Sequence, residues 1–199
     1  MKAIILTTAI LLATVLGISN GAYADTTRNE QAYTIISEVN SISKIEVHGN
    51  VQLYVSDGAT DQVKVYNNYY KETAMVQDQN GTLRISSYKN EKLVVWVTVS
   101  DLRSLDVYDN AEVRSFGKFS AIALDVRAYD NASVKLNMDV FAVNLTLNDA
   151  AKASLAGTID QGNIKYNNTS VLNTENLVAV KLVKTDVDAV KEGADFATL

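Results

Sequence analysis

Acidic residues recur at the corners of a repeated pattern, and their carboxylates are the groups in this sequence most able to do chemistry. Asp109 and Asp130 are each followed by Asn-Ala, and Asp149 is preceded by Asn148 and followed by Ala. Equivalent residues of stacked strands lie about 5 Å apart. Two carboxylates at that distance repel by about 3 kcal/mol at an effective dielectric constant of about 20. Stacked corners are therefore tolerated when the carboxylates are solvated, offset or bridged by a cation.

Three interpretations of these corners follow from their chemistry. Each Asp or Asn can satisfy the backbone of its own turn in water, which needs no ligand. Oxygen-rich acidic corners also suit calcium, for which Asp109, Asp130 and Asp149 are the candidate ligands. Paired carboxylates can also act as general acid and base in glycoside cleavage.

Tyrosine is the second residue type with binding potential. Aromatic rings offer contact area at low entropic cost, and neighbouring amides add adaptable hydrogen bonds to sugars or proteins. A purely structural role, in which the rings cover the edge of the fold, is the alternative. The candidate binding surface consists of Tyr66, Tyr69, Tyr70, Tyr108 and Tyr129.

Few other residues could support catalysis. The chain has one histidine, His48, and no cysteine. His48 lies in a predicted turn with no nucleophile motif nearby, so a Ser–His–Asp triad is not expected. Metal sites made of His pairs or thiolates are excluded, and no glycine-rich phosphate loop occurs. We therefore predict that the protein is not an enzyme, with no catalytic residues and no cofactor apart from the calcium candidates.

The element that must position the corners is a repeated pair of short strands. Asp109 and Asp130 are 21 positions apart, and Asp130 and Asp149 are 19 apart. Apolar residues alternate with polar ones before each corner, as in Leu105-Asp-Val107 and Leu124-Asp-Val126. A period near 20 with strands and no helical spacing is typical of a solenoid. We predict an all-β fold, a parallel β-helix with coils of roughly 20 residues. An evenly spaced sandwich and a leucine-rich repeat, whose template fits only at Leu102-x-x-Leu105, are the alternatives.

The repeat makes positional predictions. Asp109, Asp130 and either Asp149 or its neighbour Asn148 should form one column, and Val107, Val126 and Leu145 should form one buried stack. The apolar run Leu93–Val99 reads as a strand buried on both faces. Residues 43–85 are expected to cover one end of the stack. Residues 177–183 are expected to form the last strand, and the acidic tail 186–199 is expected to shield its edge.

The N-terminus predicts export. Lys2 precedes an apolar stretch, and Ala22-Tyr23-Ala24 is a cleavage box. A transmembrane anchor is the alternative, but the apolar stretch is short for one. We expect a signal peptide at 1–24, a flexible leader at 25–41, a β-solenoid domain at 42–199, and a periplasmic, secreted or cell-surface location with no integral membrane span after cleavage. The net charge of −5 disfavours a nucleic-acid partner.

The apolar pattern resembles the head GIN domain family of auto-transporter adhesins, a domain family of unknown function. Three stretches carry the resemblance: Ile45-x-Val47 with Val51-x-Leu53, Asn80-Gly81-Thr82-Leu83-x-Ile85, and Val95-x-Val97-x-Val99 with Leu102-x-x-Leu105. The resemblance implies a right-handed parallel β-helix in a secreted or periplasmic protein. The corners of the family usually read Ser-Gly-Ala, whereas here the Gly is replaced by Asn or Asp.

These observations favour an exported, adhesin-like binding module of the cell envelope that contacts glycan or an envelope protein. Two alternatives stay open: a carbohydrate-active lyase or hydrolase on the same architecture, and a purely structural envelope protein. The sequence does not specify the ligand or the oligomeric state.

Overall fold

The structure is a computed structural model that describes residues 33–36, 41–66 and 74–189. All of these residues belong to the unit Gln31–Leu199, and the predicted signal peptide lies outside them. Among the described residues, no helix is long and apolar enough to cross a membrane.

The described part of the chain is almost entirely β-structure, which confirms the predicted all-β class. One sheet contains its thirteen strands. They are β1 (Thr34–Ile36), β2 (Lys44–Gly49), β3 (Val51–Asp57), β4 (Gln62–Val65), β5 (Ala74–Gln79), β6 (Thr82–Ser87), β7 (Leu93–Val99), β8 (Ser104–Val107), β9 (Glu112–Ser115), β10 (Phe119–Ala128), β11 (Ser133–Leu147), β12 (Lys152–Tyr166) and β13 (Val171–Asp186).

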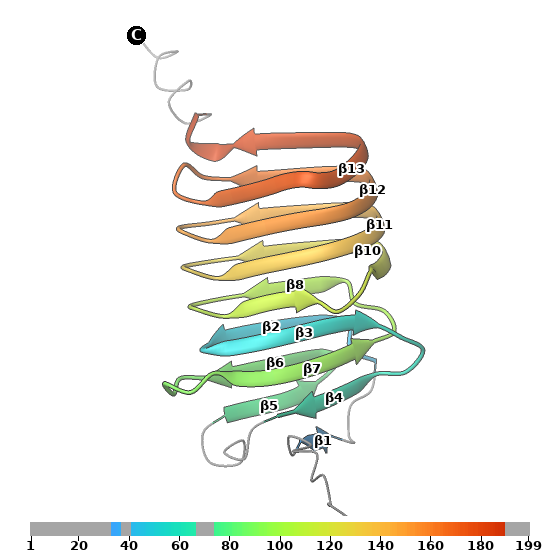
Figure 1. Ribbon diagram of the computed structural model, residues 1–199, viewed down its shortest axis with the longest axis vertical. Coiled ribbons are helices and arrows are strands. Elements are labelled where there is room, and N and C mark those ends of the chain that lie inside the picture. Colours follow the sequence, from blue (N-terminus) through green and yellow to red (C-terminus); the bar gives the residue numbers. More distant parts are fainter. Residues whose placement is uncertain (1–32, 37–40, 67–73, 190–199) are drawn as a thin grey trace, which may run out of the picture. The chain divides into compact units, whose positions relative to one another are not determined.

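The sheet curls back on itself at β11, so that its two halves face each other (Figure 1). The first residues of β11 pair in parallel with β9, and its later residues pair in parallel with β10. β12 and β13 continue both halves, because each runs along one half, bends and returns along the other. We call the two strand segments that flank one corner a layer, and the side chains between the two halves form the core.

The core follows from the alternation of the strands. In β11 every second residue from Val134 to Val140 is buried, and the residues between them are exposed. Successive side chains of a strand point to opposite faces, so one set enters the core and the other meets solvent. The same alternation holds in β7, where Trp96 is only half-buried. The prediction that Leu93–Val99 is buried on both faces was therefore wrong.

The register of the core stack differs from the predicted one. Val126 pairs with Leu105 and Leu145, whereas Val107 pairs with Ala128. All these side chains are buried as expected. The second repeat carries two additional residues before its corner. In the structure the corners of successive repeats are in register with one another. The prediction instead matched the Leu-Asp-Val stretches of the repeats, and this displaced Val107 by two positions.

The N-terminal layers do not follow sequence order. The β2/β3 layer lies between the β6/β7 layer and the β8/β9 layer. Residues 43–57 are therefore inside the stack, which corrects the prediction that 43–85 covers its end. The antiparallel strands β4 and β5 flank β7 and β6 there, and β1 pairs with β4.

Both ends of the chain differ from expectation where they are described. β1 is a short strand inside the segment that we predicted to be a flexible leader. The last strand, β13, is longer than the expected 177–183. Residues 190–199, most of the predicted shielding tail, lie outside the described residues.

Candidate functional site

The corners are tight turns whose sequence suits their backbone. The amide of Ala111 donates to the carbonyl of Tyr108 at 3.2 Å, and the amide of Ala132 donates to Tyr129 at 3.0 Å. Asp109, Asp130 and Asp149 have φ of 61°, 58° and 57°. Asp tolerates this left-handed conformation better than most residues, because its short side chain bonds locally. The recurrence of Asp at the corners therefore has a backbone reason.

The three aspartates form the predicted column, and each supports the layer before it. Oδ2 of Asp109 accepts the amide N–H of Gly49 at 2.8 Å. Oδ2 of Asp130 accepts the N–H of Asp109 at 3.0 Å, and Oδ2 of Asp149 accepts the N–H of Asp130 at 3.3 Å. A carboxylate that accepts a backbone N–H is a charge-assisted acceptor, so the column ties successive layers together.

The calcium prediction for this column stays a prediction. Within the described ranges, no group of three or more His, Asp or Glu side chains is arranged to hold a metal ion. One oxygen of each carboxylate is already used by backbone. A cation would therefore share these ligands with the corner turns.

An aromatic ladder runs beside the aspartate column. The His48 and Tyr108 rings stack at 4.4 Å with an interplanar angle of 1°, and Tyr108 and Tyr129 stack at 4.8 Å with 3°. Stacking covers the faces of the middle ring, so Tyr108 offers its edge to solvent. Partial burial, together with the nearby charge of Asp106, raises the pKa of Tyr108. The ladder joins two of the predicted tyrosines to a histidine that we had treated as an isolated turn residue.

The other predicted tyrosines are elsewhere. Tyr66 lies on the outer surface of the β4/β7 half, 5.2 Å from Tyr33 and 6.2 Å from Trp96 between ring centroids. Trp96 also contacts Tyr54 and Phe116, at 4.6 Å and 4.7 Å. Tyr69 and Tyr70 lie outside the described residues. Of the predicted tyrosines that the structure describes, Tyr108 and Tyr129 lie together, and Tyr66 belongs to a different cluster.

An ion-pair network crosses four strands on the outer surface of the other half. Lys44 Nζ contacts Glu46 Oε1 at 2.7 Å and Asp106 Oδ2 at 2.9 Å. Arg84 reaches Glu46 at 2.8 Å, and Arg127 reaches Asp106 at 3.1 Å. Hydrogen bonds from Lys44, then Arg84, hold the pKa of Glu46 below its ordinary value. Hydrogen bonds to Glu46 and Asp106 raise the pKa of Lys44.

Two neighbouring depressions hollow the surface along the corners, and we call them together the corner groove. The first has a volume of about 530 Å³ and is lined by Gly49, Tyr88, Lys89, Asn90 and Asp109, with Asn50 and Asn110. The second, of about 420 Å³, shares Asn50 and Asn110 and adds Asn131, Ser133 and the charged residues Lys92, Glu112, Arg114, Lys135 and Lys152. The groove therefore combines amides, two hydroxyls and charged groups on adjacent layers.

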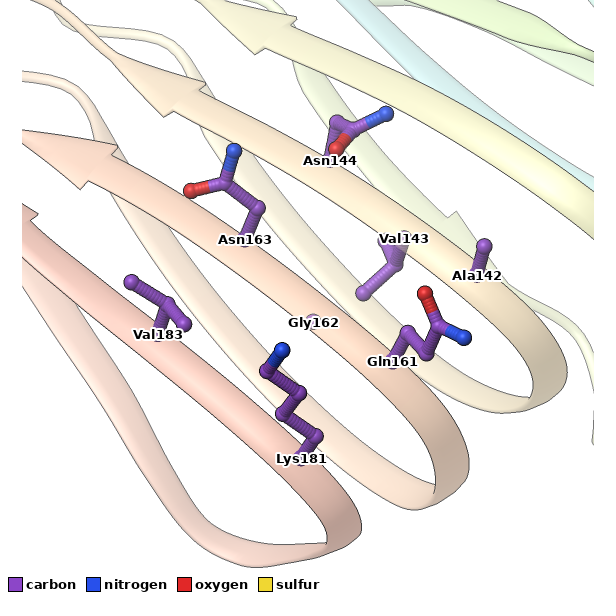
Figure 2. Close-up of a pocket in the computed structure, with 8 residues that line it drawn as sticks. All are labelled: Ala142, Val143, Asn144, Gln161, Gly162, Asn163, Lys181 and Val183. Atoms are coloured by element: carbon purple, nitrogen blue, oxygen red, sulfur yellow. The ribbon is translucent and has the colours of Figure 1, made fainter.

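A third depression, of about 280 Å³, lies across β11, β12 and β13. Figure 2 shows the side chain of Lys181 extending from β13 toward β12, with Gln161, Asn144 and Asn163 nearby. Unlike the corner groove, it has one charged residue in its lining. It is the better control surface for binding experiments.

Comparison with known proteins adds the family. The family model described as "Putative auto-transporter adhesin, head GIN domain" matches residues 41–189. The chain belongs to this family. A comparison with curated proteins found no match.

Solved structures share the fold of this head GIN domain. A "putative lipid binding protein" from Parabacteroides distasonis is 10% identical, with 77% of each chain covered and a TM-score of 0.59. A "putative adhesin" from Parabacteroides merdae is 14% identical, with 78% of each chain covered and a TM-score of 0.56. A second "putative adhesin" from P. distasonis is 16% identical, with 77% of this chain and 76% of that chain covered and a TM-score of 0.54. At these identities the likeness shows the fold alone.

Sequence reasoning missed the polar residues of the groove in this head GIN domain. Lys92, Lys135 and Lys152 are far apart in sequence, and only the strand register brings them together. Asn110 and Asn131 were visible as corner residues, but they were interpreted only as turn formers. The repeat could have revealed them, because both occupy the position after the corner Asp.

Proposed function

We propose that this head GIN domain is an exported, adhesin-like binding module of the cell envelope that contacts glycan through the corner groove. The observation that carries the proposal is the groove itself. Amide side chains from successive corners, Asn50, Asn110 and Asn131, line one concave surface. The Asn50 amide already donates to the carbonyls of Lys89 and Asn90, so Asn110 and Asn131 are the amides proposed to meet the ligand. Amides both donate and accept hydrogen bonds, which suits the hydroxyl-rich surface of a sugar.

The proposal includes the architecture and the route of export. In this proposal the layers from β8 to β13, which follow one another in sequence, are turns of a right-handed parallel β-helix that repeats the corner residues along one edge. Residues 1–24 are a signal peptide cleaved before Asp25, and the exported protein is periplasmic or on the cell surface. N-terminal sequencing of protein from the cell envelope tests this. A chain that starts at Asp25 supports export, and one that retains Met1 contradicts cleavage.

A glycan and envelope-extract binding screen tests the function, run with and without calcium. We expect glycan binding that is lost when Asn110 and Asn131 are both replaced by Ala. The matched control replaces Asn144 and Asn163 in the third depression, which removes two amides without touching the groove. Binding that both double variants retain would contradict the groove as the site. Binding only to protein components or to lipid vesicles would contradict a glycan ligand.

A further inference from the structure

The part of the corner groove between Lys92 and Lys152 is rich in positive charge, although the protein as a whole is acidic. We call it the basic row. It contains four cations, Lys92, Arg114, Lys135 and Lys152, and one carboxylate, Glu112. The chain carries a net charge of −5. A local excess of cations in an acidic protein is therefore not a consequence of composition.

The cations of the basic row are only partly neutralised. Glu112 accepts Lys92 at 2.5 Å and Arg114 at 3.3 Å, so one carboxylate serves two cations. Its pKa lies below the ordinary value because of Lys92 first and Arg114 second. Lys135 and Lys152 are exposed, and neither forms an ion pair within the described structure.

The basic row contains a pair of like charges in direct register. Arg114 on β9 pairs directly with Lys135 on β11, which places two cations side by side. On the opposite outer surface, Glu46 and Asp106 are also like-charged register partners, but Lys44 contacts both carboxylates, and Arg84 and Arg127 face them from the flanking strands. Like charges directly opposite each other are destabilising in a sheet. A bound anion between Arg114 and Lys135 removes that repulsion.

The geometry of the basic row suits an extended chain. Lys92 directly precedes β7, and the other three cations lie on β9, β11 and β12; β3, between β7 and β9, contributes none. Neighbouring strands are about 4.8 Å apart. Arg114 and Lys135 are in direct register on adjacent strands, so their separation is comparable to the advance of one sugar along an extended polysaccharide. Lys152 is in register with Ser133, two residues before Lys135. The amides of Asn110 and Asn131 lie beside the cations, where they can bond hydroxyl groups.

From these observations we infer that the basic row binds the carboxylate groups of a linear acidic polysaccharide, one that carries uronic acid residues. The inference rests on the proposed function and specifies its ligand class. Within the basic row no aromatic side chain offers a ring on which a nucleobase could stack, which favours a glycan over a single-stranded nucleic acid.

Titration calorimetry on the purified protein tests this inference. The probes are oligogalacturonate, the neutral galacto-oligosaccharide of the same length, and a thymidine oligonucleotide. We expect oligogalacturonate to bind at least tenfold more tightly than the neutral sugar, with affinity that falls as salt is raised. Lys135→Gln/Lys152→Gln should weaken that binding at least tenfold. Glu112→Gln should strengthen it, because it removes the competing carboxylate.

The matched control is Lys165→Gln/Lys181→Gln, which changes the net charge equally at exposed lysines of β12 and β13 outside the basic row. It should leave the affinity unchanged. Equal loss in both double variants would overturn the inference, as would equal affinity for the oligonucleotide. Binding of the neutral sugar with no preference for the acidic one would overturn the inference but leave the proposed function standing. No binding to any glycan would contradict both.

Discussion

The layers formed by β2, β3 and β6–β9 differ from those formed by β11–β13, although both build the same core. The earlier strands have four to seven residues and are joined by separate loops. The later strands have 15 or 16 residues and run through both halves of the sheet. In both regions buried and exposed side chains alternate along the strands. The same core pattern is therefore compatible with two different ways of connecting the layers.

The outer surfaces differ more than the interiors. The earlier layers are joined from outside by ring contacts and ion pairs, such as Tyr54 with Trp96 and Glu46 with Arg84. The outer surface of β12 and β13 carries Gln161, Asn163 and Lys181 and no ion pair among the described residues. Short strands supply fewer ladder hydrogen bonds, so the earlier layers gain more from side-chain contacts between layers.

Val126 lies where the two regions meet, and its replacement should have the largest effect. It is 1% exposed and pairs with Leu105 on one side and Leu145 on the other. Val126→Asp buries an unpaired charge, which we expect to cost about 4 kcal/mol or more and to abolish the cooperative thermal transition. Ala123→Asp, at an exposed position of the same strand, should melt close to the wild type. Two separate transitions in Val126→Asp would mean that the regions fold independently.

Gly49 tests how closely the earlier layers approach each other. It has φ of +78°, and a Cβ there would lie 2.1 Å from the carbonyl oxygen of Ser87. Gly117 has the same φ, but nothing lies within 4 Å of its Cβ position. Gly117→Ala should cost about 1 to 2 kcal/mol from backbone strain alone. Gly49→Ala should cost on the order of 3 kcal/mol in urea unfolding, because β2 must also move away from β6. Equal costs would show that the contact relaxes freely.

The aspartate column offers a graded comparison along the stack. The distance from the accepting carboxylate to the backbone amide increases from 2.8 Å at Asp109 to 3.0 Å at Asp130 and 3.3 Å at Asp149. Replacement by Gly keeps the positive φ accessible and removes the acceptor. We expect unfolding free energies to fall by about 1 kcal/mol for Asp109→Gly and progressively less for the other two. The reverse order would show that distance does not control the contribution of the column.

How far the sequence predicts the structure depends on the region. In residues 104–186 each layer follows the previous one, so the spacing of Asp109, Asp130 and Asp149 was enough to place the corner column. The β2/β3 layer could not be placed, because its neighbours are separated from it by the β4 and β5 excursions. The groove shows the same limit. Its corner amides repeat with the period, whereas Lys92 joins them only through the tertiary pairing of β7 with β3.

The smallest expected effect concerns the ion pairs of the earlier layers. The pKa of Glu46 is lowered in the folded state from its ordinary value of 4.5 by hydrogen bonds from Lys44 and Arg84. A carboxyl group whose pKa is lower when folded releases its proton more readily in the native state. Its contribution to stability is therefore present above the unfolded pKa and is lost as the pH falls through the folded pKa.

Glu46→Gln should therefore destabilise the protein by under about 1 kcal/mol near neutral pH, since the pair is partly exposed. The difference from the wild type should shrink toward zero as the pH falls from 4.5 through the lower pKa of the folded state, where the wild-type carboxyl also becomes neutral. Glu175→Gln, on β13, is the matched control, because its carboxylate forms no ion pair in the described structure. Urea unfolding across this pH range measures both variants. If Glu46→Gln and Glu175→Gln lose stability equally at neutral pH, the ion pairs do not distinguish the earlier layers from the later ones. Core packing and strand pairing would then account for the stability of both regions.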